Sequence, residues 1–422
     1  MILQNLSISK LKEENILIFL FLFSFVIRIP VIYFFGDTGL EYEWKSLVEN
    51  LIEYNQLGWK DCEFAYSITK LCLDSGFILP NLWMPPLYAY YLYIFTFLNL
   101  AEQNYIFLIL SSQILFACIS VAVFYKINKL FFSKKISFYS SVLFSCFPLY
   151  LYSCSQISSI SIQVFLTILF FYFFFQLIEK RSLSSIILFS LSSGLLILLR
   201  GEFYAILILT LIYLMFLKIN IKQILLIILI TSLTVSPYLI RNVLIFEKIV
   251  MTKSFGYNLW KGNHPHAIKN SLVVGAEIVD EAFQKQLDSV PRDKYLRINF
   301  EKIFLERAIQ NIQKEPVENL KLFFRKIISF LLIDFNSPDP NYYNPIHYLS
   351  VLLLGITSLI GIGLSDKKSN ELNYLILIFF AYVFIFSTVS ILPRYKLIIF
   401  PMQIIFTSVL IKSLAKFFYQ NK

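Results

Sequence analysis

Residues 16–35 read ILIFLFLFSFVIRIPVIYFF, an apolar run in which Arg28 is the only charged side chain. A helix of about 20 apolar residues is long enough to cross the hydrocarbon core of a bilayer. Runs of similar length recur along the 422-residue chain, which is 57% hydrophobic and 15% charged and has a mean hydropathy of +0.68. One soluble core cannot bury so much apolar surface. The composition excludes a soluble enzyme and predicts an all-α polytopic membrane protein.

The first apolar run also has the position of a secretory signal. It lacks a small-residue cleavage site, however, and many more apolar segments follow it. We therefore predict that it is retained as the first of about ten transmembrane helices. The predicted spans begin near residues 16, 104, 136, 157, 183, 203, 222, 346, 372 and 396.

The net charge of +10 is interpreted as a topology signal and not as a sign of nucleic-acid binding, because Lys and Arg concentrate in cytoplasmic loops. The basic clusters all fall on the cytoplasmic side if the apolar stretch Pro85–Ala101 does not cross the membrane. Four tyrosines crowd the first half of that stretch, and tyrosine prefers the headgroup level of a bilayer. We predict a juxtamembrane helix there, on the external face.

This topology places two long segments outside the membrane, residues 36–103 and 241–345. It divides the chain into an N-terminal transmembrane module (1–240), a long external loop (241–345) and C-terminal transmembrane helices (346–422). Cys62 and Cys72 share the first external segment, where an oxidising compartment permits a disulfide, but their spacing leaves that bridge open. No Cys/His spacing typical of a metal site occurs, so we expect no cofactor and leave the use of a divalent metal open.

The long external loop is predicted to be mostly helical between residues 275 and 334. Pro291 and Pro316 are expected at helix starts, where the missing N–H of proline costs nothing. Residues 316–335 carry apolar side chains at helical spacing with basic residues between them. This pattern predicts a second helix that lies in the membrane interface.

Ionisable side chains at the external ends of the spans are candidate site residues, because charges near hydrocarbon are costly and often mark a substrate path. Asp37 follows the first span in the run GDTGLEYEW, residues 36–44. One interpretation makes Asp37 the N-cap of the next helix. The other makes it a general base at the membrane surface, where partial desolvation raises the basicity of a carboxylate. Its position alone does not separate the two.

Three arginines are predicted on the same membrane face as Asp37. Each arginine has a polar or charged neighbour in the sequence: Glu202 lies near Arg200, Asn242 follows Arg241, and Lys396 lies near Arg394. Taken alone, Arg200 and Glu202 suit an ordinary interfacial ion pair. Taken together, the arginines suit an anion, because guanidinium groups recognise phosphate oxygens through paired hydrogen bonds. A carboxylate base beside such a set indicates group transfer from a phosphate leaving group.

The stretch GYNLWKGNHP, residues 256–265, combines glycines, amide side chains and aromatic rings. It suits a turn-rich surface loop. It equally suits a sugar-binding segment, because aromatic rings pack on the apolar faces of pyranoses while amides meet hydroxyls. Composition leaves this choice open. The candidate substrate-binding side chains here are Tyr257, Asn258, Trp260, Asn263 and His264.

Several short motifs, in chain order, resemble those of the bacterial GT-C glycosyltransferases, the relatives of protein O-mannosyltransferases and of the aminoarabinose transferase that acts on lipid A. They are GD (36–37) followed by Tyr42, PPLY (85–88), LRGE (199–202), PYLIRN (237–242), GYNLWKGN (256–263) and RY (394–395). The most specific elements are the Pro-x-x-x-Arg-Asn stretch and the glycine-rich loop after it. The resemblance runs from the first span to the last.

The resemblance implies a GT-C-like bundle and an inverting glycosyltransferase that takes a sugar from a polyprenyl-phosphate donor. Asp37 matches the family's catalytic aspartate and would deprotonate the hydroxyl or amine of a glycan, lipid or protein acceptor. The cations Arg200, Arg241, Arg394 and Lys396 would stabilise the leaving phosphate. Glu41 would assist Asp37 as a second catalytic side chain, and Glu202 and Asn242 would bind and orient the substrates. The scheme requires no metal, and it implies a bacterial cytoplasmic membrane with the active site on the periplasmic or external side.

The chain departs from the family pattern at Met84, where relatives of the lipid A enzyme often carry Lys before the Pro-Pro pair, so the sugar and the acceptor stay open. Two other classes of function remain. A transporter or flippase of lipid-linked sugars would place ionisable groups near the bilayer midplane and often shows repeated halves. A glycan ligase or polymerase would depend on a histidine, His264 or His266, more than on Asp37. A non-catalytic partner subunit is a further alternative.

Overall fold

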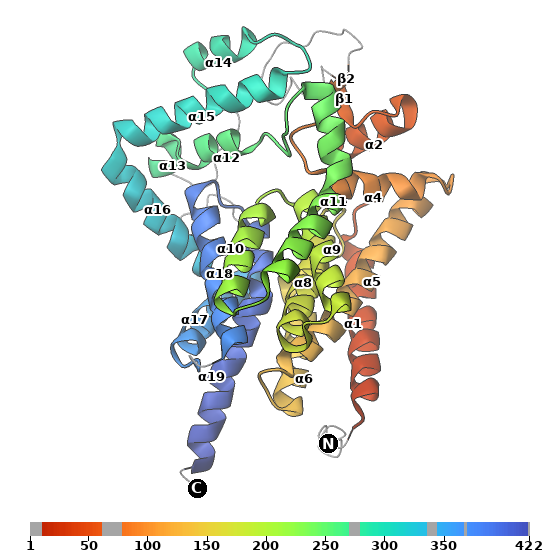
Figure 1. Cartoon of the computed structure of the whole chain (residues 1–422), viewed down its shortest axis with the longest axis vertical. Helices are drawn as coiled ribbons and strands as arrows, with labels where there is room; N and C mark the ends of the chain where they lie inside the picture. The colour runs from red at the N-terminus through yellow and green to blue at the C-terminus, as the bar shows by residue number, and fades with distance from the viewer. Residues whose placement is uncertain (1–10, 61–77, 270–278, 336–343, 367–368, 421–422) are drawn as a thin grey trace.

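The computed structural model describes residues 11–60, 78–269, 279–335, 344–366 and 369–420. Long helices stand side by side in a bundle, and a layer of shorter elements covers one end of it (Figure 1). The predicted all-α polytopic membrane fold is confirmed. Cys62 and Cys72, considered above for a disulfide, lie outside the described residues.

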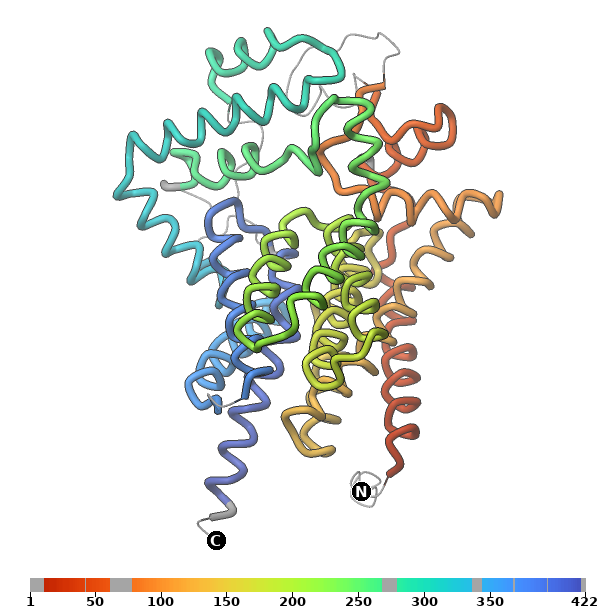
Figure 2. Tube along the Cα trace, viewed as in Figure 1, coloured from red at the N-terminus to blue at the C-terminus, as the bar shows by residue number. Residues whose placement is uncertain are grey.

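Seven helices in the described part of the chain are long and apolar enough to cross a membrane. They are α1 (Glu13–Phe35), α5 (Glu102–Asn128), α8 (Ile160–Lys180), α11 (Ile221–Phe246), α17 (Pro345–Gly363), α18 (Asn370–Thr388) and α19 (Phe400–Gln420). Two shorter apolar helices, α9 (Leu183–Leu199) and α10 (Phe203–Phe216), stand among them. α1 begins and α19 ends at the same end of the bundle, away from the covering layer (Figure 2).

The predicted span near residue 136 is divided into two short helices. α6 (Lys134–Cys146) ends before Phe147, whose backbone is extended, and α7 (Pro148–Ser153) begins at the following proline. Proline disfavours a helical conformation in the residue before it and has no N–H to donate to the preceding turn. In the described part of the chain, the ten predicted spans correspond to seven long helices, two shorter ones and this broken pair.

Hydroxyl contacts join helices of the bundle in addition to apolar packing. Ser140 of α6 and Ser408 of α19 lie 2.6 Å apart at their hydroxyl oxygens. Gly361 of α17 lies so close to the backbone carbonyl of Phe406 that a Cβ atom there would collide with it. Small residues allow such close approach in membrane proteins, where apolar contact between helices gains little over contact with lipid.

The layer at the bundle end, here called the polar layer, is built from described residues of the segments 36–103 and 241–345. Its elements are α2 (Tyr42–Tyr54), β1 (Gly58–Lys60), β2 (Ile78–Pro80), α12 (Phe255–Gly262), α13 (Pro265–Lys269), α14 (Glu281–Asp288) and α15 (Leu296–Lys314). β1 and β2 pair antiparallel, with Trp59 opposite Leu79. α15 packs along α12.

The prediction that a helix starts at Pro291 is wrong. α15 begins at Leu296, after a turn in which the Asp293 carboxylate accepts the Tyr295 N–H at 2.8 Å. Asp side chains favour such turns because they bind the backbone two residues on. The prediction for Pro316 is confirmed, because it occupies the first turn of α16 (Pro316–Leu331).

Two helices run across the bundle direction on opposite sides of the molecule, α16 and α4 (Pro86–Thr96) (Figure 1). α4 has 11 residues, too few to cross a bilayer. α16 exposes Val317, Leu320, Phe324 and Ile328, each by more than half of its surface. Both helices thus have the form predicted for interfacial helices.

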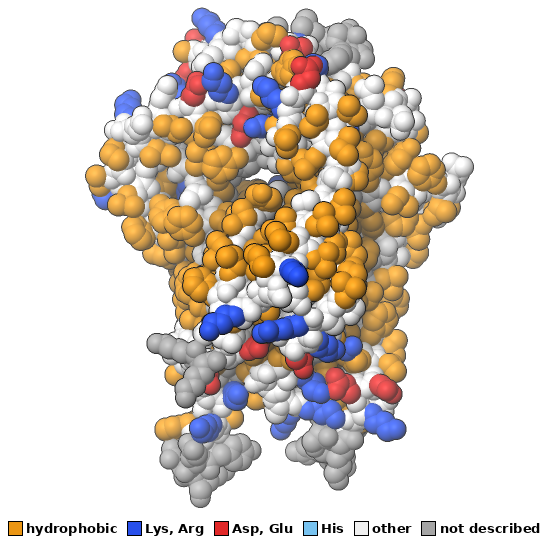
Figure 3. Space-filling model, in the orientation of Figure 1, with side chains coloured by type: hydrophobic (Ala, Val, Ile, Leu, Met, Phe, Trp, Pro, Cys, Tyr) orange, Lys and Arg blue, Asp and Glu red, His pale blue; other side chains and the backbone are white. Residues whose placement is uncertain are grey.

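The surface shows the division expected of a membrane protein. In Figure 3, apolar side chains cover the middle of the visible face of the bundle, and Lys and Arg gather toward the bundle end opposite the polar layer. That end holds the α5–α6, α8–α9 and α10–α11 joints, which contain Lys129, Arg181 and Lys218, and the first residue of α6, Lys134. The chain is therefore a multi-pass membrane protein with one basic end and one covered end.

Candidate functional site

A cavity of about 540 Å³ lies where the polar layer meets the bundle. Its walls come from the starts of α2, α4 and α10, from α12, and from the segment that joins α18 to the 3-10 helix η3 (Pro393–Ile398). Its polar lining includes Glu41, Glu43, Ser158, Ser159, Arg200, Glu202, Asn258, Lys261 and Arg394. Its aromatic lining includes Trp44, Trp83, Tyr88, Phe255, Tyr257, Phe386 and Tyr395. A cavity of this size admits a ligand as large as a sugar phosphate.

Asp37 lies beside this cavity and anchors two segments to each other. Its backbone N–H donates to the Ser155 carbonyl at 3.0 Å, and its carboxylate accepts the Ile157 N–H at 2.6 Å. α2 starts at Tyr42 with Glu41 in the N-cap position, so Asp37 is not the cap of the next helix. The charge of Asp37 acts on Tyr88, which lines the cavity: burial raises the Tyr88 pKa well above its ordinary value, and Tyr91, Tyr105 and then Asp37 add to that rise.

Two carboxylates at the start of α2 line the cavity, and the sequence analysis identified only Glu41. Glu43 has a raised pKa, chiefly because its carboxylate is desolvated, and Glu41 adds to the rise while Arg394, Arg297 and Lys261 oppose it. Within the described part of the chain, the Glu43 carboxylate makes no hydrogen bond and no ion pair. Its exposure to the cavity depends on how α2 packs, which the local sequence does not reveal.

Arg200, near the middle of the sequence, and Arg394, near its C-terminal end, both line the cavity and meet at one ring. Their guanidinium groups lie 5.6 and 5.8 Å from the centre of the Tyr395 ring. The Arg200 Nε donates to Gln163 Oε1 at 3.0 Å, and its two terminal nitrogens bind no described residue. The expected ion pair with Glu202 is absent from the described residues, although Glu202 also lines the cavity. This arrangement leaves guanidinium donors available to an anion.

The structure does not bring Arg241 to the cavity. Its terminal nitrogens donate to the backbone carbonyls of Leu57 and Asn81 at 2.8 and 3.1 Å and to the Asn242 side chain at 2.7 Å. The Asn242 amide in turn donates to the Val250 carbonyl at 2.8 Å. The Pro-x-x-x-Arg-Asn stretch therefore holds the β1–β2 hairpin against α11.

Lys396 is also separated from the cavity lining. Its side chain is 1% exposed and its Nζ donates to the Leu332 carbonyl at 3.1 Å. Burial lowers the Lys396 pKa to about 7, against the opposing charge of Asp334. These contacts tie η3 to the end of α16 and leave no direct route to a ligand in the cavity.

The glycine-rich stretch forms α12, and its residues divide between two roles. Tyr257, Asn258 and Lys261 line the cavity. Trp260 is 1% exposed and packs among aromatic rings of α14 and α15, and His264 contacts its edge. The Trp260, Asn263 and His264 side chains therefore do not line the cavity, contrary to what their composition suggested.

Glycine has a packing reason in this stretch. A Cβ atom at Gly262 would collide with the backbone of Val389 and Ser390, in the segment that leads to Arg394. The Asn263 amide donates to the Thr388 carbonyl at 2.9 Å, and the Ser390 N–H donates to the Asn258 carbonyl at 3.2 Å. α12 thus positions the wall that carries Arg394.

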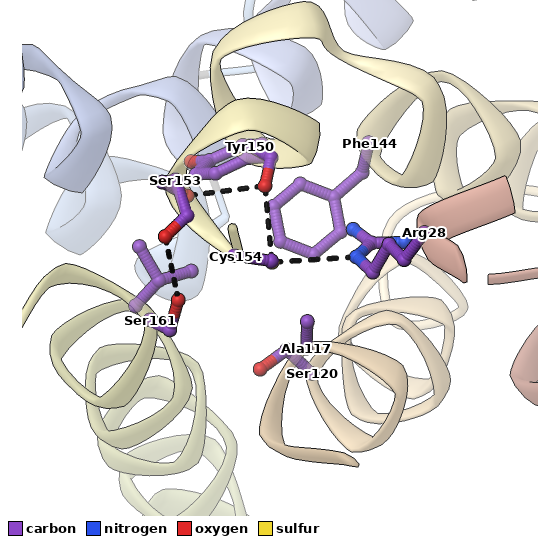
Figure 4. A pocket seen from close by; sticks show the side chains of 9 residues that line it. Arg28, Ala117, Ser120, Phe144, Tyr150, Ser153, Cys154 and Ser161 are labelled. Atoms are coloured by element: carbon purple, nitrogen blue, oxygen red, sulfur yellow. Dashed lines mark hydrogen bonds between the residues drawn. The ribbon is translucent and has the colours of Figure 1, made fainter. Parts of the chain in front are cut away.

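A second, small space surrounds Arg28 inside the bundle (Figure 4). The Arg28 guanidinium donates to Ser24 Oγ at 2.6 Å, to Ser145 Oγ at 3.3 Å and to Cys154 Sγ at 3.4 Å. The volume, about 10 Å³, holds at most about one water molecule. This space is too small for a substrate, and Arg28 serves to join α1 to α6 and α7.

Metal ligands are not grouped in the described part of the chain. No set of three His, Cys, Asp or Glu residues there is placed to hold a metal ion.

The comparison with protein families matches residues 84–240 to the family model for dolichyl-phosphate-mannose-protein mannosyltransferase. The matched segment contains Arg200 and Glu202 but neither Asp37 nor Arg394. No curated protein matches the chain significantly in sequence.

Among solved structures, the chain resembles the oligosaccharyltransferase of Archaeoglobus fulgidus. The AglB complex with an inhibitory peptide and a dolichol-phosphate is 12% identical, with a TM-score of 0.56 over 94% of this chain and 50% of that one. The apo form is 14% identical, with a TM-score of 0.55 over 96% of this chain and 51% of that one. The chain thus spans about half the length of these structures. Such low identities show a shared fold, and with the family match they confirm the predicted resemblance to the GT-C superfamily of membrane glycosyltransferases.

Proposed function

We propose that the protein is a glycosyltransferase that moves a sugar from a polyprenyl-phosphate donor to an acceptor hydroxyl or amine in the 540 Å³ cavity. One observation carries the proposal: Arg200 and Arg394 meet at the Tyr395 ring on a cavity wall that also presents carboxylates. The cavity lies at the end of the apolar bundle, the level at which a membrane lipid presents its phosphate.

Arg200 and Arg394 bind the donor phosphate in this proposal. Paired hydrogen bonds from guanidinium groups fit phosphate oxygens, and preorganised cations stabilise the charge that develops on a leaving phosphate. The structural neighbour that was solved with a dolichol-phosphate shares the fold of this chain, which agrees with a lipid-phosphate donor.

Asp37 is the proposed general base. The acceptor oxygen or nitrogen forms a bond to the anomeric carbon, its proton passes to the Asp37 carboxylate, and the bond between the anomeric carbon and the phosphate oxygen breaks with its electron pair on the phosphate. A single displacement of this kind inverts the anomeric centre. The Ile157 N–H, which Asp37 accepts at 2.6 Å, holds the carboxylate in place beside the cavity.

We further propose that the cavity faces the outside of a bacterial cytoplasmic membrane. The Lys- and Arg-rich joints lie at the other end of the bundle, and such joints concentrate on the cytoplasmic side. The acceptor is a glycan, a lipid or a protein on that outer side.

The test of the proposed function is Asp37→Asn in protein reconstituted in lipid nanodiscs. Asn keeps an oxygen that accepts the Ile157 N–H but removes the base, so we expect the transfer rate from a synthetic polyprenyl-phosphate sugar to fall about 10²- to 10⁴-fold. Binding of the donor, measured by native mass spectrometry, is expected to persist.

Glu306→Gln is the matched control, because this side chain lies on α15 and makes only an exposed contact with Lys302. It is expected to leave the transfer rate unchanged. Full activity in Asp37→Asn would remove the proposed mechanism, and a wild-type protein that binds no polyprenyl phosphate would remove the proposed donor.

A further inference from the structure

Trp83 lies on the cavity wall in a short, firmly held segment that precedes α4. The Asn81 side chain is fully buried and accepts the N–H groups of Trp83 and Met84 at 2.9 and 3.1 Å, while its amide donates to the Met84 carbonyl at 2.8 Å. The Asn81 carbonyl is itself bound by Arg241. The backbone that carries Trp83 is thereby fixed on both sides.

The indole ring of Trp83 is also fixed by its neighbours. The Arg297 guanidinium, 3% exposed, lies over the ring at 4.3 Å from its centre. The Tyr257 ring, on α12, meets the indole at 4.8 Å with an interplanar angle of 60°. A cation over an indole and an edge contact between rings are both favourable geometries. The ring surface that remains partly exposed borders the cavity.

Glu43 also lines the cavity and supplies a hydrogen-bond acceptor there. Its charge and that of Arg297 act on each other, and both also act on Tyr257, so the three side chains lie near one another. The Glu43 carboxylate makes no hydrogen bond within the described residues. Carboxylates bind hydroxyl groups strongly, through charge-assisted hydrogen bonds.

We propose that Trp83, held by Arg297 and Tyr257, forms a platform for a pyranose ring, and that Glu43 accepts hydrogen bonds from the hydroxyl groups of that ring. The C–H face of a pyranose packs on an aromatic ring, while its hydroxyls need polar partners at the edge, and this wall offers both. The ring belongs either to the donor or to the acceptor. The inference rests on the proposed function for the cavity as the place of transfer.

The first experiment measures sugar binding without transfer. Free glucose, mannose and N-acetylglucosamine are the probes, and saturation-transfer difference NMR on the protein in nanodiscs detects the ring protons that touch it. We expect a signal in the wild type, an affinity about tenfold lower in Trp83→Ala, and most of the affinity retained in Trp83→Phe. Glu43→Gln alters no described packing contact and is expected to weaken binding about threefold.

Phe324→Ala is the control, because it removes an exposed aromatic ring of α16 that does not line the cavity. It is expected to bind sugars as the wild type does. Equal signals in the wild type, Trp83→Ala and Glu43→Gln, or no signal in the wild type, would overturn the platform.

The second experiment uses transfer kinetics to decide whether the bound pyranose ring belongs to the donor or to the acceptor. A rise in KM for the polyprenyl-phosphate sugar in Trp83→Ala assigns the platform to the donor, and a rise in KM for the acceptor assigns it to the acceptor. Unchanged KM values for both overturn the inference while leaving the proposed function intact. Sugar binding that depends on Trp83, in a protein that transfers from no polyprenyl-phosphate sugar, keeps the platform and overturns the proposed function.

Discussion

The cavity wall around Tyr395 and the support beneath the β1–β2 hairpin both use arginine, and they use it in opposite ways. At the cavity wall, the terminal nitrogens of Arg200 and Arg394 bind no described residue. At the hairpin support, Arg241 gives its terminal nitrogens to the carbonyls of Leu57 and Asn81 and to Asn242. Arginine donors are thus available to a ligand at the cavity wall, whereas at the hairpin support they are bound to other residues of the protein.

A charged residue at the end of a membrane helix therefore has no fixed role. Arg200 and Arg241 both lie at or near the end of an apolar helix that meets the polar layer. Arg241 acquires its structural role because a hairpin about 160 to 180 positions earlier in the chain brings carbonyls to it. The availability of an arginine to a ligand is thus set by long-range contacts.

The strongest test of this contrast removes the arginines of the cavity wall. Arg200→Ala and Arg394→Ala are each expected to lower transfer about 10²- to 10³-fold, because each removes a preorganised cation from the leaving phosphate. Binding of bare polyprenyl phosphate, followed by native mass spectrometry, is expected to weaken in both. Thermal unfolding serves as the control and should change little in Arg394→Ala, whose side chain is exposed.

The second test removes the arginine of the hairpin support. Arg241→Ala leaves the buried carbonyls beneath the hairpin without their donor, so we expect a loss of about 2–4 kcal/mol in the free energy of unfolding. The lower melting temperature is measured by scanning fluorimetry in nanodiscs. A variant that keeps its stability but loses affinity for polyprenyl phosphate would contradict the structural role of Arg241 and would show that it binds phosphate, as Arg200 and Arg394 are proposed to do.

The smallest effect is expected at Glu43, the carboxylate that faces Arg394 without binding it. Its pKa is raised above the ordinary 4.5, mainly by desolvation, so stability is lost as the pH rises above the ordinary value and the loss is complete above the raised pKa. Glu43→Gln avoids that cost. We expect its melting temperature to be slightly above that of the wild type at neutral pH, with the difference vanishing as the pH falls below the ordinary value. A variant less stable than the wild type at neutral pH would contradict this.

Features that depend on local pattern were predictable. The apolar runs predict most of the spans, and the tyrosine content of residues 85–101 predicts the helix α4. Amphipathic spacing predicts α16, with Pro316 in its first turn. The break at Pro148 and the late start of α15 were missed, because a proline signals a boundary without stating whether a helix begins there or several residues later.

The candidate site was only partly predictable. Asp37, Arg200 and Arg394 carry charges at span ends, and that signal placed them at or beside the cavity. Trp83 and Glu43 were missed, because their access to the cavity depends on α2, α12 and α15 meeting across distant parts of the chain. The composition of residues 256–265 makes Trp260 a candidate for substrate binding. Its side chain is instead buried among rings of α14 and α15, where it has a packing role.

The shortness of α10 has a consequence for the lipid around the protein. Its 14 residues span about 21 Å, well below the roughly 30 Å of a typical hydrocarbon core. α10 begins directly after Arg200, Gly201 and Glu202, which line the cavity. A bilayer meets such hydrophobic mismatch by local thinning. The membrane beside α10 is therefore expected to be locally thin, which brings lipid headgroups closer to the cavity and, under the proposed function, shortens the distance over which the lipid donor leaves the leaflet.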